Sequence, residues 1–126
     1  MKVLGNTLLA ELIRCRNSIL NEADVIEEIG RESARLAGAT VLKSEKHQFT
    51  PQGVSVVVFI AESHIAIHTW PEYDYAAVDI FTCGEKVNPR LALDYIVQKL
   101  GAEVSRSLEI KRGLPDSEGD KMIPHK

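Results

Sequence analysis

Residues 53–84 read GVSVVVFIAESHIAIHTWPEYDYAAVDIFTCG, and this stretch decides how the rest of the chain folds. Runs rich in β-branched and aromatic residues follow one another at 54–60, 65–69 and 75–82. Such runs, separated by polar or proline-containing breaks, predict short consecutive strands. Parallel neighbours need a crossover of about a dozen residues, so these closely linked strands are expected to pair antiparallel.

A first helix is expected before this stretch. Asn21 resembles an N-cap, and the acidic residues Glu22 and Asp24 follow in the first turn, where they favour the helix dipole. Gly38 supplies a C-terminal stop. The helix should lie on the sheet through residues that recur at helical spacing. These are Val25, Ile26, Ile29, Ser33, Leu36 and Ala37.

A second helix is expected after the stretch. Asn88 followed by Pro89 is a typical helix start, with a capping side chain and proline at the first helical position. Gly101 marks its end. Its predicted buried stripe consists of Leu93, Ile96, Val97 and Leu100.

Further strands are expected at 4–14, 40–49 and 103–111, with a turn at 50–53 and an extended tail at 113–126. Helix competes with strand at 4–14, because Leu, Ala and Glu are good helix formers. The pattern predicts an α+β domain, a two-layer sandwich with two helices on one face of a largely antiparallel sheet. The strand at 54–60 is apolar on both faces and needs a second cover, which a partner subunit could provide.

Composition bounds the class of protein. The chain has 126 residues, enough for a single domain over 1–126. A net charge of -3 offers no basic face for nucleic acid. No apolar run approaches the roughly 20 residues that cross a membrane, and the start lacks a signal peptide's apolar core, so a cytoplasmic protein is expected. Cys15 and Cys83 are then expected to be free thiols, with Cys15 a small, partly buried residue near a strand end.

Several linked motifs lie in the central stretch: ESH at 62–64, IHTWPEY at 67–73, YAAVD at 75–79 and FTCG at 81–84. Together they resemble the prokaryotic S-adenosylmethionine decarboxylases, enzymes that cut their own chain and make a pyruvoyl cofactor from an internal serine. The resemblance extends from about residue 4 to about residue 113 and favours a strand at the start of the chain. It implies a homodimer with four α/β/β/α layers and no metal.

The resemblance implies that Ser63 is the pyruvoyl precursor. Its hydroxyl would attack the carbonyl of Glu62, the amide would become an ester, and elimination would split the chain into 1–62 (the β chain) and 63–126 (the α chain). The new end would become a ketone. A tight bend between two strands at Ser63 could bring the hydroxyl to that carbonyl.

The resemblance assigns the other reacting groups as well. His68 is the candidate base for the elimination, because imidazole takes up a proton near neutral pH. Ser55 could hydrogen-bond the tetrahedral intermediate. After the substrate amine forms a Schiff base with the ketone and carbon dioxide leaves, the pyruvoyl group acts as an electron sink. Cys83 would then return a proton to the substrate carbon.

Taken singly, these residues have ordinary structural explanations. Ser63 is typical of a turn, His68 of a hydrogen-bonded core histidine, and Cys83 of a small residue at a strand end. His64 and His68 have the spacing of a zinc motif, but on a strand they lie about 13 Å apart and cannot share one metal. A triad of Ser63, His68 and Asp79 would lack the Gly-x-Ser-x-Gly elbow. The resemblance favours the pyruvoyl interpretation over these.

The resemblance also suggests substrate contacts. Phe49 and Trp70 match an aromatic pair that stacks adenine, and Glu72 matches a carboxylate that holds the ribose hydroxyls. Phe49 could act across a dimer interface. Without the resemblance, both aromatics would be assigned to core packing and Glu72 to a solvated loop.

Asp74 departs from the family, whose members mostly have glycine between the two tyrosines of this motif. Asp tolerates left-handed backbone geometry, so Asp74 could replace glycine in a turn. Alternatively its carboxylate could pair with a second cationic group of the substrate, as in ornithine or arginine.

Three functions follow from these observations. The first is a self-processing carboxy-lyase that converts S-adenosylmethionine to its decarboxylated form, the aminopropyl donor for spermidine biosynthesis. The second is the same machinery acting on ornithine or arginine. The third is an unprocessed, inert homologue that binds a ligand or partner.

Overall fold

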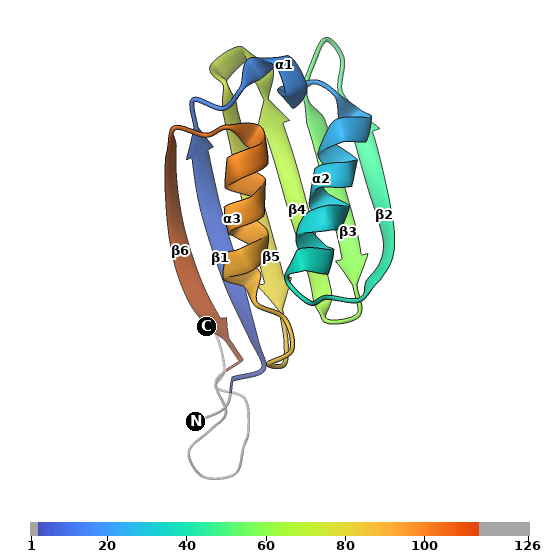
Figure 1. Cartoon of the computed structure of the whole chain (residues 1–126), viewed down its shortest axis with the longest axis vertical. Helices are drawn as coiled ribbons and strands as arrows, with labels where there is room; N and C mark the ends of the chain where they lie inside the picture. Colours follow the sequence, from blue (N-terminus) through green and yellow to red (C-terminus); the bar gives the residue numbers. More distant parts are fainter. Residues whose placement is uncertain (1–2, 114–126) are drawn as a thin grey trace, which may run out of the picture.

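The computed structural model describes residues 3–113, and within them all strands belong to one six-stranded antiparallel sheet (Figure 1). Its strand order is β2-β3-β4-β5-β1-β6. The strands are β1 (Gly5–Ile13), β2 (Val41–Gln48), β3 (Val54–Ile60), β4 (Ser63–Trp70), β5 (Tyr75–Thr82) and β6 (Val104–Arg112). The helices are α1 (Asn17–Leu20), α2 (Ala23–Leu36), the 3-10 turn η1 (Pro71–Tyr73) and α3 (Pro89–Leu100). The predicted α+β class is therefore confirmed, including the strand at the start of the chain.

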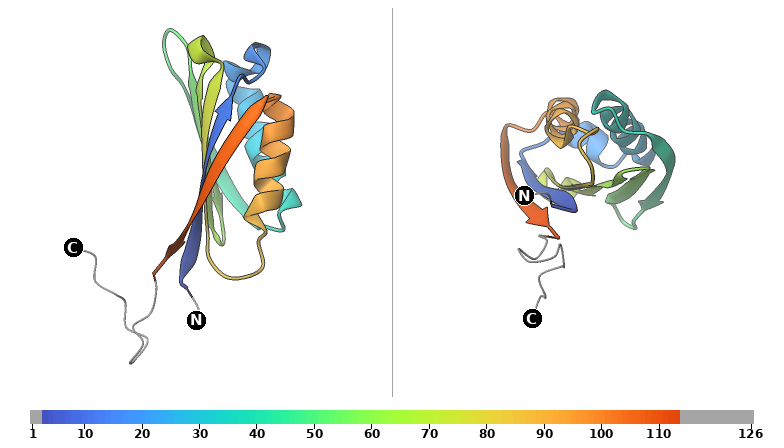
Figure 2. Two further views of the ribbon diagram at one scale, coloured as in Figure 1. Left: turned by 90° about the vertical axis from the view of Figure 1, so that its left-hand side faces the viewer. Right: turned by 90° about the horizontal axis from the view of Figure 1, so that it is seen from below.

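Helices α2 and α3 lie side by side on one face of the sheet (Figure 2). Successive side chains of a strand point to opposite faces, so every second residue of the central strands reaches the layer under the helices. The core there is mainly aliphatic. Its fully buried strand residues include Leu12, Val54, Val56, Val58, Ile65, Ile67, Val78 and Ile80.

Helix α3 begins and ends as predicted. The Asn88 side chain accepts a hydrogen bond from the Arg90 N–H at 3.1 Å, and Pro89 occupies the first helical position. Gly101 closes the helix with a left-handed backbone, φ 66° and ψ 33°. Leu93, Ile96 and Leu100 are buried, as their spacing indicates, and Val97 is partly buried against the core. Local capping chemistry determines both boundaries of this helix.

The predicted start of the first long helix is wrong. Helix α2 begins at Ala23 with Glu22 at the N-cap position, while Asn21 ends a short helix, α1, that the sequence pattern did not predict. The Asn21 side chain accepts a hydrogen bond from the Gly53 N–H at 2.8 Å. A partner 32 residues away in sequence thus uses the oxygen that would otherwise cap the helix.

The predicted apolar stripe of α2 is only partly correct. Ile26 and Ile29 are buried, but the side chains at the two margins are not, with Val25 39% and Leu36 51% exposed. The buried face of α2 also includes Gly30, where an added Cβ would lie 3.0 Å from Val58. The helix therefore lies close to the sheet along a narrower stripe than its spacing predicts.

No helix covers the opposite face of the sheet within residues 3–113 (Figure 2). We call this surface the open face. Strand alternation places Ser55, Phe59, His64 and His68 on it. Phe59 is 37% exposed there, so the apolar second face predicted for the strand at 54–60 is present. The pairing of two such faces into a four-layer dimer remains a prediction.

Two further expectations concern the ends of the chain and membranes. The predicted tail from 113 onward lies outside the described residues except for Gly113 itself. None of the helices in the described part of the chain is long and apolar enough to cross a membrane.

Candidate active site

Strand β4 separates the predicted site residues into two groups. Ser63 is its first residue and pairs with Thr82, whereas His68 lies five residues further on and pairs with Ser55. A strand rises about 3.3 Å per residue, so Ser63 and His68 of one chain are about 16 Å apart. We call the region of Ser63, Glu62 and Cys83 the cleavage end. We call the region of His68 and Ser55 the pocket end. The structure does not bring the predicted base and the predicted nucleophile together within one chain.

The cleavage end begins with a tight link between β3 and β4. Only Ala61 and Glu62 separate the two strands, and the next residue, Ser63, has φ 143°. Residues with a side chain rarely adopt such a positive φ, which costs backbone energy of order 1–3 kcal/mol. The predicted bend is therefore present, and its strain falls on the residue that the family resemblance assigns as the nucleophile.

The Glu62 carbonyl accepts two hydrogen bonds from Cys83. The backbone N–H of Cys83 donates at 3.0 Å, and its Sγ donates at 3.2 Å. Donors directed at one carbonyl oxygen polarise it and stabilise negative charge that develops on it during attack. Cys83 is an exposed free thiol, and here it contacts the bond that is predicted to break.

The Glu62 side chain is anchored beside this bond. Its carboxylate accepts the Thr40 N–H at 3.2 Å and lies 3.5 Å from Lys86 Nζ, which also donates to Thr40 Oγ1 at 2.9 Å. Burial raises the pKa of the Glu62 carboxyl, but the backbone N–H groups of Thr40 and Glu62 and the Lys86 charge outweigh burial and bring the pKa below its ordinary value. The group is thus ionised at neutral pH and fixes the residue before Ser63.

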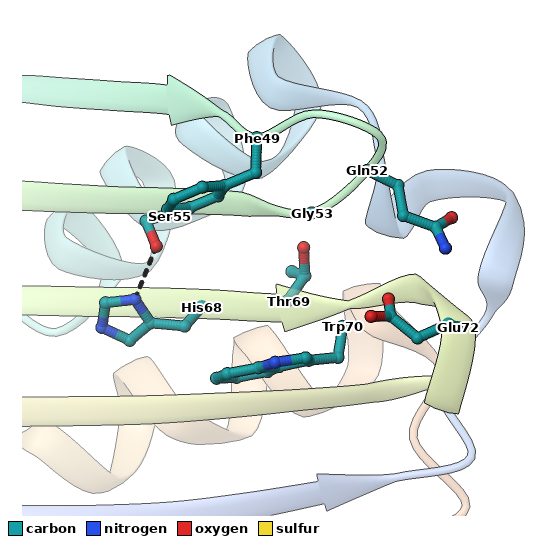
Figure 3. A pocket seen from close by; sticks show the side chains of 8 residues that line it. All are labelled: Phe49, Gln52, Gly53, Ser55, His68, Thr69, Trp70 and Glu72. Atoms are coloured by element: carbon teal, nitrogen blue, oxygen red, sulfur yellow. Dashed lines mark hydrogen bonds between the residues drawn. The ribbon is translucent and has the colours of Figure 1, made fainter.

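The pocket end encloses about 340 Å³ beside the ends of β3 and β4 (Figure 3). Ser55 Oγ and His68 Nδ1 are 2.8 Å apart, so the hydroxyl and the imidazole form one hydrogen-bonded unit. Phe49 and Trp70 are 47% and 41% exposed, which leaves aromatic surface open to a ligand. The lining residues are Phe49, Gln52, Gly53, Ser55, His68, Thr69, Trp70 and Glu72. All the residues that the resemblance assigned to substrate contact, apart from Asp74, line this one pocket.

The loop after β2 forms one wall of the pocket. The Phe49 N–H donates to the Gly53 carbonyl at 2.8 Å, which closes the turn. The Asn21 side-chain oxygen accepts a hydrogen bond from the Gly53 N–H. Gly53 has φ 110°, and an added Cβ would lie 3.3 Å from the Thr69 carbonyl. This turn needs glycine at 53 in order to lie against β4.

Besides Gly53, two lining residues, Thr69 and Gln52, were not predicted from the sequence as part of the site. Thr69 is buried, donates to the Leu20 carbonyl at 2.7 Å and accepts the Val54 N–H at 2.9 Å, so it ties β4 to its neighbours. Gln52 extends from the turn toward the same side of the pocket as Glu72 (Figure 3). Its place after Pro51 marked only a turn, and no sequence pattern identified it as a pocket residue.

Asp74 occupies a turn and does not line the pocket. Its backbone is left-handed, with φ 50° and ψ 39°, at the end of η1. Its carboxylate accepts a hydrogen bond from Asn17 Nδ2 at 2.8 Å, and its carbonyl accepts the Cys15 N–H at 2.7 Å. The structure therefore supports the explanation that Asp74 replaces glycine in a turn, and it gives no support to a cation-binding role.

The arrangement of side chains does not support the two alternative chemistries, a zinc site and a serine triad. Within residues 3–113, no three His, Cys, Asp or Glu side chains lie close enough to hold a metal ion. Asp79 pairs with Ala66, between the two ends of β4, and the distance from Ser63 to His68 prevents a triad within one chain.

Cys15 is buried just beyond β1, as expected, and burial raises its pKa to about 11.

Comparison with known proteins agrees with this arrangement. The family model described as S-adenosylmethionine decarboxylase matches residues 6–113. The chain belongs to this family. The S-adenosylmethionine decarboxylase proenzyme of Acetivibrio thermocellus is 54% identical over 114 residues, which are 90% of this chain and 92% of the relative. That of Thermodesulfovibrio yellowstonii is 44% identical over 126 residues, covering 100% and 93%.

The fold also matches a solved structure of the S-adenosylmethionine decarboxylase family. The crystal structure of the adenosylmethionine decarboxylase from Aquifex aeolicus VF5 superposes with a TM-score of 0.87 and 34% sequence identity. The match covers 96% of this chain and 100% of that one. Family and fold are thus as predicted from the sequence, while the roles of individual residues remain predictions.

Proposed function

We propose that the chain is a self-processing, pyruvoyl-dependent S-adenosylmethionine decarboxylase. It is cut between Glu62 and Ser63 and yields decarboxylated S-adenosylmethionine, an aminopropyl donor for spermidine biosynthesis. The observation that carries this proposal is the pair of Cys83 hydrogen bonds to the Glu62 carbonyl, next to a serine with strained backbone. Homologues named as proenzymes of this decarboxylase support it.

The cleavage end favours attack by its own serine. Ser63 Oγ adds to the Glu62 carbonyl, and the two Cys83 donors stabilise the oxygen as it becomes negative. Lys86 and Thr40 hold the Glu62 carboxylate, so the carbonyl keeps its direction. When the amide becomes an ester and the chain separates, position 63 becomes planar, and the unfavourable φ of 143° is released.

The residues present fit a pyruvoyl cofactor at position 63. Once formed, the pyruvoyl group would supply a ketone that binds the substrate amine and accepts electrons as carbon dioxide leaves. The Cys83 thiol is exposed beside this position and donates the proton that the substrate carbon requires. At the pocket end, Phe49 and Trp70 offer aromatic surface for a planar base, and the Glu72 carboxylate accepts hydrogen bonds from ribose hydroxyls.

A complete site needs two copies of the chain. Ser63 and His68 lie about 16 Å apart on one strand, too far for direct proton transfer. Two open faces packed about a two-fold axis perpendicular to the strands would run their β4 strands in opposite directions and place the cleavage end of one copy against the pocket end of the other. The homodimer therefore contains two sites, each with Ser63 from one subunit and His68, Ser55 and Phe49 from the second.

The pocket favours S-adenosylmethionine over a basic amino acid. Glu72 is the only carboxylate among the lining residues, and Asp74 is held by Asn17 away from the pocket.

We place the enzyme in the cytoplasm, where a reducing environment keeps Cys83 as the thiol that both processing and turnover require.

Intact mass spectrometry of the purified protein tests the proposal. Processing gives two species of about 7 kDa, because the break divides a 14.0 kDa chain near its middle. Incubation with S-adenosylmethionine should then release carbon dioxide, while ornithine and arginine release none. One stable species of 14.0 kDa without a hydrazine-reactive carbonyl would contradict the proposal.

A further inference from the structure

Within residues 3–113 of a single chain, the imidazole next to the Ser63 hydroxyl is that of His64 and not that of His68. Ser63 Oγ and His64 Nδ1 are 3.4 Å apart, while His68 lies at the far end of the strand. Within the described residues, no other side chain makes a hydrogen bond with this hydroxyl. A first proton acceptor for the nucleophile is thus available inside a single chain.

We propose that His64 is a further catalytic residue, the base for the first step of self-processing. His64 Nδ1 takes the proton from Ser63 Oγ as the bond from Oγ to the Glu62 carbonyl carbon forms. The bond between that carbon and the Ser63 nitrogen then breaks, and the imidazolium returns the proton to the nitrogen. One ester and one amine replace one amide, and no other reactant is needed. This inference rests on the proposed function.

The surroundings of His64 hold its ring beside the serine. His64 pairs with Phe59 on β3 and with Phe81 on β5, and its ring centroid lies 5.9 Å from that of Phe81. Adjacent residues of a regular strand point to opposite faces, which would separate the two side chains. The φ of 143° at Ser63 interrupts that regularity, and its hydroxyl lies within reach of the ring. Backbone strain and base position thus occur together.

The two histidines then serve different steps. The shift from amide to ester uses Ser63, His64 and Cys83, which lie together in one chain. The elimination that follows uses His68 of the second copy. Loss of His64 should therefore stop the chain as an amide, whereas loss of His68 should stop it as an ester. Neutral hydroxylamine cleaves esters and leaves amides intact, so the two blocked chains are chemically distinguishable.

The experiment follows newly synthesised full-length chains by intact mass, with and without hydroxylamine. His64→Ala and His64→Gln should process about 10²-fold more slowly than the unaltered chain and should stay whole in hydroxylamine. Added imidazole should restore cleavage of His64→Ala. His68→Ala should stay whole alone and split in hydroxylamine. Gln98→Ala, which alters an exposed side chain on α3, on the side of the sheet away from the open face, should process at the unaltered rate.

Two results would overturn the role of His64: processing of both variants at the unaltered rate, or their arrest as a hydroxylamine-sensitive ester. Thermal unfolding identifies any variant that does not fold. If His64→Ala does not fold, His64→Gln decides the role of His64, because glutamine keeps a polar side chain of similar length but has no basic group. A failure of the proposed function is separate, because in that case the unaltered chain itself would never split.

Discussion

The two ends of β4 carry different kinds of chemistry on one strand. The cleavage end is built from backbone: a short link, a positive φ at Ser63, and a carbonyl held by the Cys83 N–H and Sγ. The pocket end is built from side chains around an open space, with Phe49 and Trp70 nearly half exposed. The first arrangement suits a reaction of the chain with itself, and the second suits a ligand that must enter and leave.

The largest effect should come from removing the nucleophile. Ser63→Ala has no hydroxyl to attack the Glu62 carbonyl, so cleavage should be abolished and intact mass should show one species of 14.0 kDa. The variant keeps Phe49, Trp70 and Glu72, so the pocket end should still bind S-adenosylmethionine in calorimetry. Appearance of two fragments from Ser63→Ala would move the cut elsewhere and break the distinction between the ends.

Removing one of the two donors to the Glu62 carbonyl should have the next largest effect. Cys83→Ala keeps the backbone N–H but loses the Sγ donor, and loss of one such donor slows the reaction about 10²-fold. The rate of fragment formation after synthesis measures this. Cys83→Ser, which restores an O–H donor, should recover much of the rate. Equal, unaltered rates for both variants would show that the thiol contact is not used in processing.

A substitution of a ligand contact at the pocket end, away from Ser55 and His68, should leave processing unchanged. Glu72→Gln removes the charge that strengthens hydrogen bonds to substrate hydroxyls, so KM for S-adenosylmethionine should rise about tenfold. The yield of the two fragments should not change. Glu28→Gln, on the exposed surface of α2, is a matched control and should alter neither quantity. A processing defect in Glu72→Gln would show that Glu72 does not serve ligand binding alone.

The smallest effect should be a pH-dependent change in stability at the cleavage end. The pKa of Glu62 is lowered in the folded chain, so its ionised form adds stability above the unfolded pKa, and this contribution disappears as the pH falls through the folded pKa. In a Ser63→Ala background, Glu62→Gln should lower Tm by a few degrees at pH 7. The difference should shrink as the pH falls below the ordinary value of 4.5 and vanish below the lowered pKa of the folded chain.

Much of the fold follows from local sequence signals. Runs rich in β-branched residues indicate β3 to β5, and Asn88 and Gly101 define α3, because strand preference and helix capping act over a few residues. The cap at Asn21 could not be predicted in this way. Its oxygen binds Gly53 and Gln48, and only the tertiary fold brings those groups near.

The site was predictable in its residues more than in its arrangement. Family motifs identified Ser63, His68 and Cys83, but motifs carry no distances. The separation of Ser63 from His68 does follow from strand rise alone, because residues five apart on one strand cannot touch. The contact between His64 and Ser63 could not be foreseen, since a regular strand would direct the two side chains to opposite faces.

Co-expression of two inactive chains decides whether the ends of β4 meet between subunits. A Ser63→Ala chain keeps His68, and a His68→Ala chain keeps Ser63, so a mixed dimer contains one complete site across its interface. With the two chains distinguished by mass, fragments should form from the His68→Ala chain only, and neither chain should split alone. If neither chain is cut in mixed dimers shown to form, His68 does not act on Ser63 of the other copy, and the two-subunit site is wrong.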